Sequence, residues 1–269
     1  MAENTERTAT GSFAALIMAA GQGKRMKDPT RAKVMYELNG KPMVHYVADL
    51  AYALGACRVI LIVGYQRDLV TDYLRVSHPD ALCVTQEPQL GTGHAVLQAE
   101  RALEGFDGTV LVLSGDVPLL TESTMRALIK HHLNARAVAT ILTAMMDDPT
   151  GYGRIIRNPD GSVRQIVEHR DASEEDRRIR EINSGIYLFE KQKLFEGLHH
   201  ITPHNVQNEY YLTDVFGYFW KHQWMVSALL APQVEEIHGI NTVQQLDQAR
   251  VILESRLAQE VTPNPSSSS

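Results

Sequence analysis

The first half of the chain alternates short apolar runs with stretches in which apolar residues recur at helical spacing. The runs at 13–20, 58–63 and 109–113 are almost continuously apolar and lead into glycines, which is typical of strands buried on both faces of a sheet. Further strands are expected at 82–85 and 137–145, and helices at 42–54, 67–76, 94–103 and 121–133. This alternation predicts right-handed βαβ units and a mainly parallel sheet.

The pattern changes after Asp148. Shorter strand-like segments replace the alternation, and the charged segment 173–180 is expected to form a solvated helix. Strands are expected at 152–157, 163–168, 181–189 and 226–231, and helices at 190–199, 212–222 and 242–258. The chain is therefore predicted to be an α/β protein with a second, smaller part.

Composition and charge narrow the class of protein. Hydrophobic residues make up 44% and charged residues 22% of the 269 residues, as in ordinary globular domains, and the net charge of −6 disfavours a nucleic-acid partner. The N-terminus lacks an apolar signal core, and no apolar stretch reaches the roughly 20 residues of a membrane span. Cys57 and Cys83 are isolated in apolar runs, so we expect buried, reduced thiols and a cytoplasmic location. Residues 1–12 and 259–269 are expected to be disordered tails around one domain, 13–258.

The first apolar run leads into the loop Ala19-Ala20-Gly21-Gln22-Gly23-Lys24-Arg25-Met26. Met26 occupies the position where a dinucleotide-binding fingerprint has Gly or Ala, and Arg25 occupies the Ser/Thr position of a P-loop. We interpret the loop instead as a triphosphate cradle, because glycines permit close backbone approach and Lys24, Arg25 and Lys33 offer cations. The alternative is a solvated surface loop.

A second glycine loop, Gln86-Glu-Pro-Gln-Leu-Gly-Thr-Gly-His-Ala95, precedes an expected helix. Gly91, Thr92 and Gly93 would open a helix N-terminus to a ligand, and the Gln86 amide, with its donor and acceptor, suits the edge of a pyrimidine base. The alternative is a helix-capping loop. His94 is expected to be structural.

Asp116 follows the third buried strand, at the edge of the sheet where ligands bind in doubly wound folds. A carboxylate beside a phosphate loop suits Mg²⁺, which needs only one or two protein oxygens in addition to phosphates and waters. The alternative is a cap for the helix that begins near Thr121. Asn241 has a similar alternative as the N-cap of the last helix.

Polar residues in the second part suit a sugar ligand. Glu168 and Asn183 offer groups for sugar hydroxyls and an N-acetyl group, although each also suits a turn or cap. The chain lacks the sequence signatures of a hydrolase nucleophile elbow and of a His-Glu-x-x-His zinc site.

These motifs together resemble the N-terminal uridyltransferase domain of the bacterial bifunctional N-acetylglucosamine-1-phosphate uridyltransferase/glucosamine-1-phosphate acetyltransferases, over about residues 13–258. The motifs that carry the resemblance are AAGQGKRM, QLGTGHA, GDVPL, DDPTGYGRI, VEHRDA, EINSGI and EYYLTD. The resemblance implies a Rossmann-like, mainly parallel sheet flanked by helices, with a nucleotide half at about 13–146, a sugar-binding part at about 147–241 and a C-terminal helix at 242–258.

The resemblance also implies roles for individual residues, in a Mg²⁺-dependent transfer of UMP from UTP to N-acetylglucosamine-1-phosphate. Arg25, Lys33 and Asp116 would be catalytic, with Asp116 and Asn241 as ligands of Mg²⁺. The remaining implied substrate contacts are Ala19, Ala20, Gly21 and Gly23 in the phosphate loop, Gln86, Gly91 and Thr92 beside uracil, and Gly153, Glu168, Asn183, Tyr211 and Thr213 around the sugar.

Several positions depart from the family pattern. Lys24 stands where Thr is usual, and Ala32 stands where Pro is usual. Ser114 stands where Tyr is usual, and this departure leaves the sugar specificity open. The family's C-terminal β-helix, which carries acetyl transfer and trimer formation, is missing, so neither acetyl transfer nor a particular oligomeric state is expected. Two alternatives stay open: another substrate pair, such as dTTP or UTP with glucose-1-phosphate, and a non-catalytic protein that binds sugar nucleotides.

Overall fold

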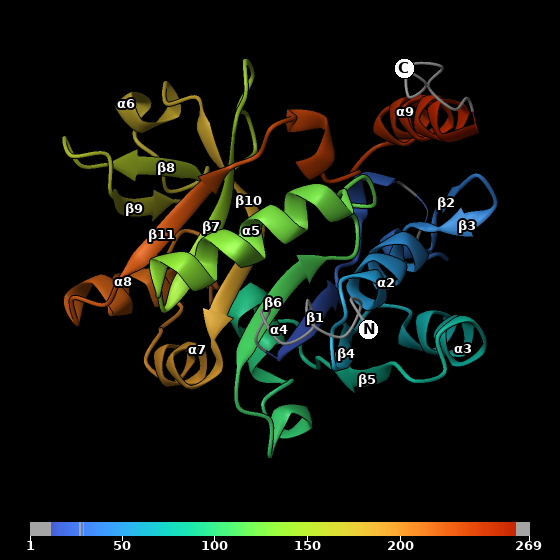
Figure 1. The fold of residues 1–269 in the computed structure, drawn as a ribbon, viewed down its shortest axis with the longest axis horizontal. Helices are drawn as coiled ribbons and strands as arrows, with labels where there is room; N and C mark the ends of the chain where they lie inside the picture. Colours follow the sequence, from blue (N-terminus) through green and yellow to red (C-terminus); the bar gives the residue numbers. More distant parts are fainter. Residues whose placement is uncertain (1–11, 27, 29, 262–269) are drawn as a thin grey trace, which may run out of the picture.

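A single large sheet forms the centre of the protein in the computed structural model, which describes residues 12–26, 28 and 30–261 (Figure 1). Seven of its nine strands follow the order β11-β7-β10-β6-β1-β4-β5, and β8 and β9 attach beside β10. The strands are β1 (Phe13–Ala19), β4 (Arg58–Val63), β5 (Leu82–Thr85), β6 (Thr109–Ser114), β7 (Ala139–Met145), β8 (Arg154–Arg157), β9 (Val163–Val167), β10 (Glu181–Glu190) and β11 (Val226–Leu230). β1, β4, β5 and β6 are mutually parallel, as the apolar runs predict.

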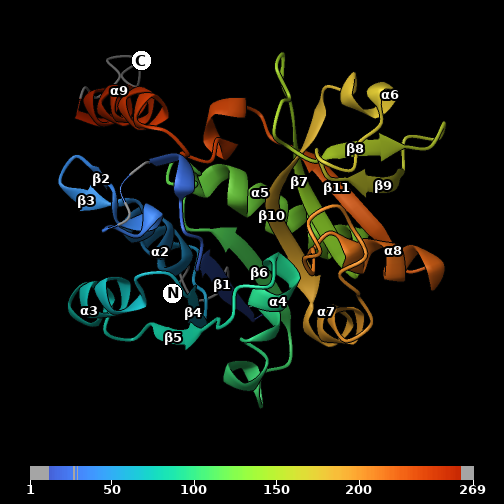
Figure 2. The same ribbon diagram turned by 180° about the vertical axis from the view of Figure 1, so that it is seen from behind.

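Helices cover both faces of this sheet (Figures 1 and 2). Alternate residues of β1 enter opposite cores: Ala15 and Ile17 pack with α2, α3 and α5, whereas Ala14 and Leu16 pack with α4, α7 and α8. The helices are α2 (Met43–Ala53), α3 (Arg67–Ser77), α4 (Thr92–Leu97), α5 (Glu122–Ala135), α6 (Glu174–Arg177), α7 (Lys191–Leu198), α8 (Asp214–Lys221) and α9 (Val243–Val261). Burial on both faces explains why the central strands are apolar along their whole length.

The second part of the chain completes the main sheet. β10 lies antiparallel between β6 and β7, and β11 pairs in parallel with β7. The register of β10 shifts between Asn183 and Tyr187, where Gly185 has a φ of 81°. The seven-strand path is therefore mainly parallel with one reversed strand near its middle, and β8 and β9 add antiparallel pairings beside it. The division into a nucleotide half and a sugar-binding part stays a prediction.

Some local predictions are wrong. The helix expected at 94–103 is the short α4 followed by a separate 3₁₀ turn, η3 (Arg101–Leu103), and the small hairpin of β2 (Glu37–Leu38) and β3 (Lys41–Pro42) was not expected. Cys57 is exposed, with Sγ 3.3 Å from Ser12 Oγ, because it precedes β4 instead of lying within it.

The ends of the chain are only partly described. The last helix continues to Val261, three residues beyond its predicted end, so the tail expected from 259 begins within α9. Of the tails expected at 1–12 and 259–269, residues 1–11 and 262–269 lie outside the described residues.

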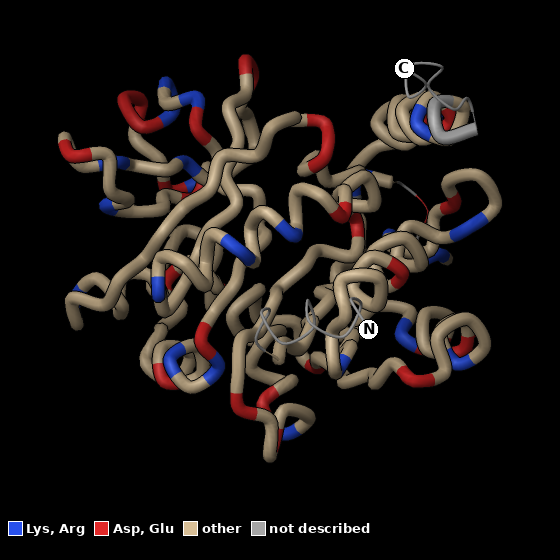
Figure 3. The backbone as a smooth tube through the Cα atoms, in the orientation of Figure 1, with Lys and Arg blue, Asp and Glu red and all other residues tan. Residues whose placement is uncertain are grey.

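Acidic and basic residues are interspersed with one another along the described backbone (Figure 3). Within that same part of the chain, no helix combines the length and the apolar character that a membrane crossing requires.

Candidate active site

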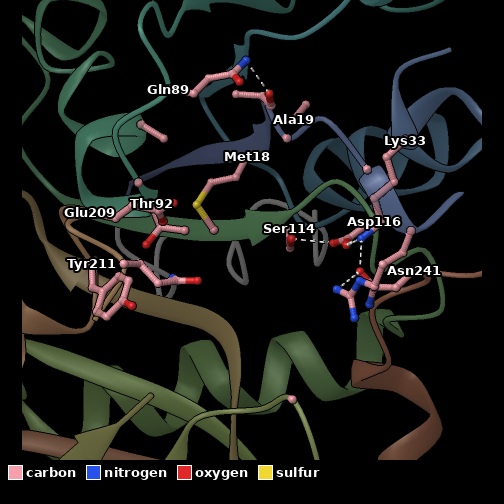
Figure 4. Close-up of a pocket in the computed structure, with 18 of the residues that line it drawn as sticks. Met18, Ala19, Lys33, Gln89, Thr92, Ser114, Asp116, Glu209, Tyr211 and Asn241 are labelled. Carbon is pink, nitrogen blue, oxygen red and sulfur yellow. Dashed lines mark hydrogen bonds and ion pairs between the residues drawn. The ribbon is translucent and has the colours of Figure 1, made fainter. Parts of the chain in front are cut away.

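The carboxyl ends of β1, β5 and β6 open onto a cavity of about 840 Å³ (Figure 4). This edge is where ligands bind in open α/β sheets. Residues that follow β1, β5 and β6 line the cavity together with residues of the second part of the chain. The predicted site residues among its lining are Ala19, Ala20, Gly21, Gly23, Arg25, Lys33, Gln86, Gly91, Thr92, Asp116, Glu168, Tyr211 and Asn241.

A second cavity of about 200 Å³ adjoins the first, and both share Thr92 and Glu168 in their walls. It is lined by the remaining predicted residues, Gly153, Asn183 and Thr213. The structure thus brings every predicted site residue into two connected cavities. The side chain of Lys24 lies outside the described part of the chain.

A cluster of charged and polar groups marks one end of the larger cavity (Figure 4). Lys33 Nζ donates to Asp116 Oδ2, and it lies 2.5 Å from Asn241 Oδ1. Arg25 Nη2 donates to the same Asn241 oxygen at 2.7 Å. Two cations and two oxygen-bearing side chains therefore meet, although they come from segments up to 216 residues apart.

Neither Asn241 nor Asp116 caps a helix, because other residues cap the helices that begin near them. Thr242 Oγ1 accepts from Gln245 N at 3.2 Å, and Gln245 Oε1 accepts from Thr242 N at 3.1 Å, which is a capping-box arrangement at the start of α9. Thr121 caps α5 by accepting from Thr124 N. The capping alternatives for Asn241 and Asp116 are therefore wrong.

The environment of Asp116 keeps its carboxylate ionised. Burial raises the pKa of Asp116, but the charge and hydrogen bond of Lys33 and the hydrogen bond of Ser114 outweigh burial, so the pKa lies below its ordinary value. Ser114 Oγ donates to Asp116 Oδ1 at 2.6 Å. Each carboxylate oxygen therefore has its own donor.

The same residues fit a divalent cation. Asp116 Oδ2 and Asn241 Oδ1 both contact the Lys33 ammonium, so one positive charge can reach both oxygens. A carboxylate and an amide oxygen are the hard ligands that Mg²⁺ prefers. Gly239 leaves room beside them, because a Cβ there would lie 3.4 Å from Asp116 Oδ2.

The second glycine loop is attached to the second part of the chain by its backbone. Gly93 N donates to Tyr210 O at 2.7 Å, and Leu212 N donates to Thr92 Oγ1 at 2.9 Å. Gly91 has a φ of 111°, and a Cβ there would lie 2.6 Å from Tyr210 O. Only glycine fits this position without strain.

Gln86 helps to fix the same loop. Its Nε2 donates to Gly91 O at 2.9 Å and lies 3.1 Å from His94 Nδ1. The amide nitrogen of Gln86 is thus engaged with the protein. The prediction that both donor and acceptor face a base is therefore reduced to the amide oxygen, the acceptor. The contacts of His94 with Gln86 and Gln98 agree with the structural role expected for it.

The smaller cavity gathers polar groups around Glu168. Thr213 Oγ1 donates to Glu168 Oε1 at 3.0 Å, and a Cβ on Gly153 would lie 3.3 Å from Glu168 Oε2. Asn183 Nδ2 donates to Tyr187 OH at 2.7 Å, which orients the amide. Burial raises the pKa of Glu168. This wall can offer hydrogen bonds to a polar ligand of sugar size.

Sequence reasoning missed several lining residues: Met18, Gln89, Arg170, Gln207 and Glu209. Three of them, Gln89, Arg170 and Glu209, stand inside motifs that were recognised, so position within the motif was an available signal. Gln89 joins the two glycine loops, because its Nε2 donates to Ala20 O at 2.9 Å.

Comparisons with known proteins agree on one family. Residues 14–234 match the nucleotidyl transferase family. The chain is 47% identical over 250 residues to a protein from Geobacillus thermodenitrificans named Bifunctional protein GlmU, covering 93% of this chain and 54% of that protein. A protein of the same name from Listeria monocytogenes is 46% identical over 243 residues, covering 90% and 52%. The chain thus spans about half the length of these curated relatives.

Two solved structures share the fold. A UDP-glucose pyrophosphorylase complexed with UDP-glucose superposes with a TM-score of 0.74 at 19% identity, over 91% of this chain and 99% of that one. A putative glucose-1-phosphate thymidylyltransferase from Bacillus anthracis gives 0.72 at 18% identity, over 90% and 95%. They confirm the predicted α/β fold.

We expect Gly91→Ala to destabilise the protein by more than Gly161→Ala. Both glycines have positive φ, but only at Gly91 would the new Cβ collide with backbone, whereas nothing lies within 4 Å at Gly161. Strain alone costs about 1–2 kcal/mol, which sets the expected loss for Gly161→Ala. Urea unfolding of both variants checks this, and equal losses would contradict the close approach to Tyr210.

We expect Lys33→Met to lower the free energy of unfolding at pH 7, by at most about 3 kcal/mol because both partners keep some exposure. The depressed pKa of Asp116 contributes stability above its unfolded pKa of about 3.9, and this contribution is lost as pH falls through the folded pKa. The gap between wild type and variant should therefore narrow on acidification.

Urea unfolding in a pH series from 7 down to about 2, which passes below the unfolded pKa of about 3.9, measures this gap. Arg75→Met, which breaks the exposed pair with Asp72, is the control and should change stability little at any pH. A gap for Lys33→Met that stays constant with pH would contradict the pairing.

Proposed function

The chain belongs to the nucleotidyl transferase family, and from this premise we propose that it transfers UMP from UTP to N-acetylglucosamine-1-phosphate, giving UDP-N-acetylglucosamine and pyrophosphate. The observation that carries the proposal is the meeting of Lys33, Asp116 and Asn241 at one end of a cavity whose other walls are two glycine loops and a polar pocket. A triphosphate, a cation and a sugar phosphate each find suitable chemistry there.

The nucleotide is assigned to the walls of the larger cavity that the first half of the chain forms. The loop with Ala19, Ala20, Gly21 and Gly23 is proposed to follow the triphosphate, with Arg25 and Lys33 offsetting its charge. Gln86, Gly91 and Thr92 are assigned to the uracil side. The hydrogen bond from Gln86 to Gly91 supports a preformed loop, which reduces the entropy lost on binding.

The sugar is assigned to the smaller cavity and its border. Glu168 and Asn183 are proposed to bind sugar hydroxyls and the N-acetyl group, with Thr213 orienting Glu168. Gly153 is proposed to allow close backbone approach, and Tyr211 borders the same region from the larger cavity. The volume of about 200 Å³ suits one sugar ring.

The reaction is an in-line attack by a phosphate oxygen of the sugar phosphate on the α-phosphorus of UTP. A new phosphorus–oxygen bond forms, the bond to the bridging oxygen breaks, and pyrophosphate leaves with that electron pair. The attacking oxygen is already anionic, so no general base is required. Catalysis then consists of positioning and charge neutralisation.

Asp116 and Asn241 would hold Mg²⁺, which would supply positive charge to offset the negative charge of the phosphates. Ser114 holds the second oxygen of Asp116 and so fixes the orientation of the carboxylate. Lys33, which neutralises Asp116 in this structure, is proposed to donate to phosphate oxygens during the reaction.

Only this one activity is proposed for the chain. The relatives are named bifunctional, but the chain spans only about half of their length, so a second activity is not assigned to it. The oligomeric state is likewise not assigned, and a cytoplasmic location stays a prediction. The presence of Arg25, Lys33, Asp116 and Asn241 favours an enzyme over a non-catalytic binding protein.

Pyrophosphate release with Mg²⁺ tests the proposal, using UTP, dTTP, CTP, ATP and GTP, each with N-acetylglucosamine-1-phosphate or glucose-1-phosphate. We expect strong release only with UTP and the N-acetylated sugar. Release with another pair would overturn the assigned specificity but keep the reaction class. Nucleotide binding with no release from any pair would indicate a binding protein.

We expect Asp116→Ala to lower kcat by roughly 100-fold or more, because the main ligand for the cation is lost. Asp72→Ala, at an exposed carboxylate on α3, is the matched control and should keep wild-type turnover. Circular dichroism verifies that both variants are folded. Near-normal turnover of folded Asp116→Ala would show that this residue is not part of the catalytic site.

A further inference from the structure

Two histidines and a carboxylate meet between α2 and α3, apart from the active-site cavity. His45 and Asp49 lie one turn apart on α2, and His78 follows the last residue of α3. His45 Nε2 lies 3.1 Å from Asp49 Oδ2, and His78 Nε2 lies 2.9 Å from Asp49 Oδ1. The three ligand atoms lie within 4.8 Å of one another. Within the described part of the chain, none of these three residues lines the active-site cavity.

Both imidazole rings are oriented by hydrogen bonds on their other nitrogen. Tyr73 OH lies 2.9 Å from His45 Nδ1, and Ser77 Oγ lies 2.9 Å from His78 Nδ1. Each ring therefore directs its Nε2 toward Asp49. Metal-binding histidines in proteins almost always have such an outer partner, which fixes the tautomer and the ring direction.

The surroundings would exclude water from one side of the cluster only. The His78 side chain is 5% exposed and that of His45 13%, whereas Asp49 is 54% exposed. Tyr52 stacks on His78 with ring centroids 5.9 Å apart. An ion could thus enter past Asp49 and be held against one buried ring and one partly buried ring.

We propose that His45, Asp49 and His78 form a site for a divalent transition-metal ion of the Zn²⁺ class, distinct from the Mg²⁺ site proposed above. Zn²⁺ takes imidazole nitrogen and carboxylate oxygen at about 2.0–2.2 Å, which places neighbouring tetrahedral ligands roughly 3.3 Å apart. The two nitrogen–oxygen separations, each to a different oxygen of Asp49, are close to that spacing. Mg²⁺ prefers oxygen ligands and would not select two imidazoles.

One neighbouring charge opposes the ion: burial is the main cause that lowers the pKa of His45, and the charge of nearby Lys41 lowers it further. Asp49 contributes the opposite charge within the cluster itself. The site would join α2 to the end of α3, and both helices contact η2 (Lys33–Met35), the 3₁₀ turn that carries Lys33. Occupancy is therefore expected to stabilise the fold on this side of the sheet.

Calorimetric titration of the untagged protein with ZnCl₂ tests the site, and it is done in an Asp116→Asn background so that the proposed Mg²⁺ site does not contribute. We expect one Zn²⁺ per chain and a higher Tm when it is bound. Tyr73→Phe, which removes an outer partner, should weaken binding by about 10–100-fold. His45→Gln and Asp49→Asn, which remove direct ligands, should weaken it further.

His199→Gln is the matched control, because His199 pairs with Glu100 at 3.0 Å but lies outside the cluster, and it should leave Zn²⁺ binding unchanged. Co²⁺ as a spectroscopic probe should give absorption bands that are lost in His45→Gln. Absence of Zn²⁺ binding, or binding that His45→Gln and Asp49→Asn leave unaltered, would mean that the cluster is only a hydrogen-bonded link between α2 and α3. Neither result depends on whether the protein transfers UMP.

Discussion

A carboxylate at the edge of a buried sheet needs a compensating positive charge, and the arrangement around Asp116 follows from that requirement. Without Lys33, burial would favour the protonated carboxyl, which binds cations poorly. Lys33 and Ser114 each satisfy one oxygen of Asp116, and Asn241 places its own oxygen on the same ammonium group. The carboxylate of Asp116 is thereby kept ionised, and the amide oxygen of Asn241 is held beside it, before any substrate binds.

The fold brings these groups together through the sheet. β1 and β6 are adjacent and parallel, so the segments that carry Lys33 and Asp116 leave the sheet at the same edge. Asn241 comes from the far end of the chain, and Ile240 N donates to Asp116 O at 2.9 Å, which fixes its approach. The reversed strand β10 then places Asn183 beside the same edge, and so connects the smaller cavity to the two glycine loops.

Much of this arrangement could be predicted from the sequence, because fully buried strands have continuous apolar runs and glycine loops follow them at the ligand edge. The position of β10 could not, since the apolar pattern of a strand does not specify its neighbours. Asn241 was ambiguous because asparagine is both a good N-cap and an oxygen ligand. The hydrogen bonds between Thr242 and Gln245 exclude the N-cap role, and the role of Asn241 as a ligand stays a prediction.

Gln86 illustrates a different limit of sequence reasoning. Its amide suits a base edge, but the structure engages the donor with Gly91, which no local pattern reveals. The cluster of His45, Asp49 and His78 was missed for a related reason. Along the chain, β4 and α3 separate His78 from the other two residues. Contacts between distant segments are set by packing, not by spacing along the chain.

The most direct measurement is crystallographic: anomalous diffraction at the manganese edge from crystals that contain Mn²⁺ and a non-hydrolysable UTP analogue. We expect an anomalous peak within coordination distance of Asp116 Oδ2 and Asn241 Oδ1, with Lys33 Nζ moved from the carboxylate to a phosphate oxygen. A bound nucleotide with Lys33 still on Asp116, or a manganese peak that touches neither oxygen, would contradict this role of the cluster.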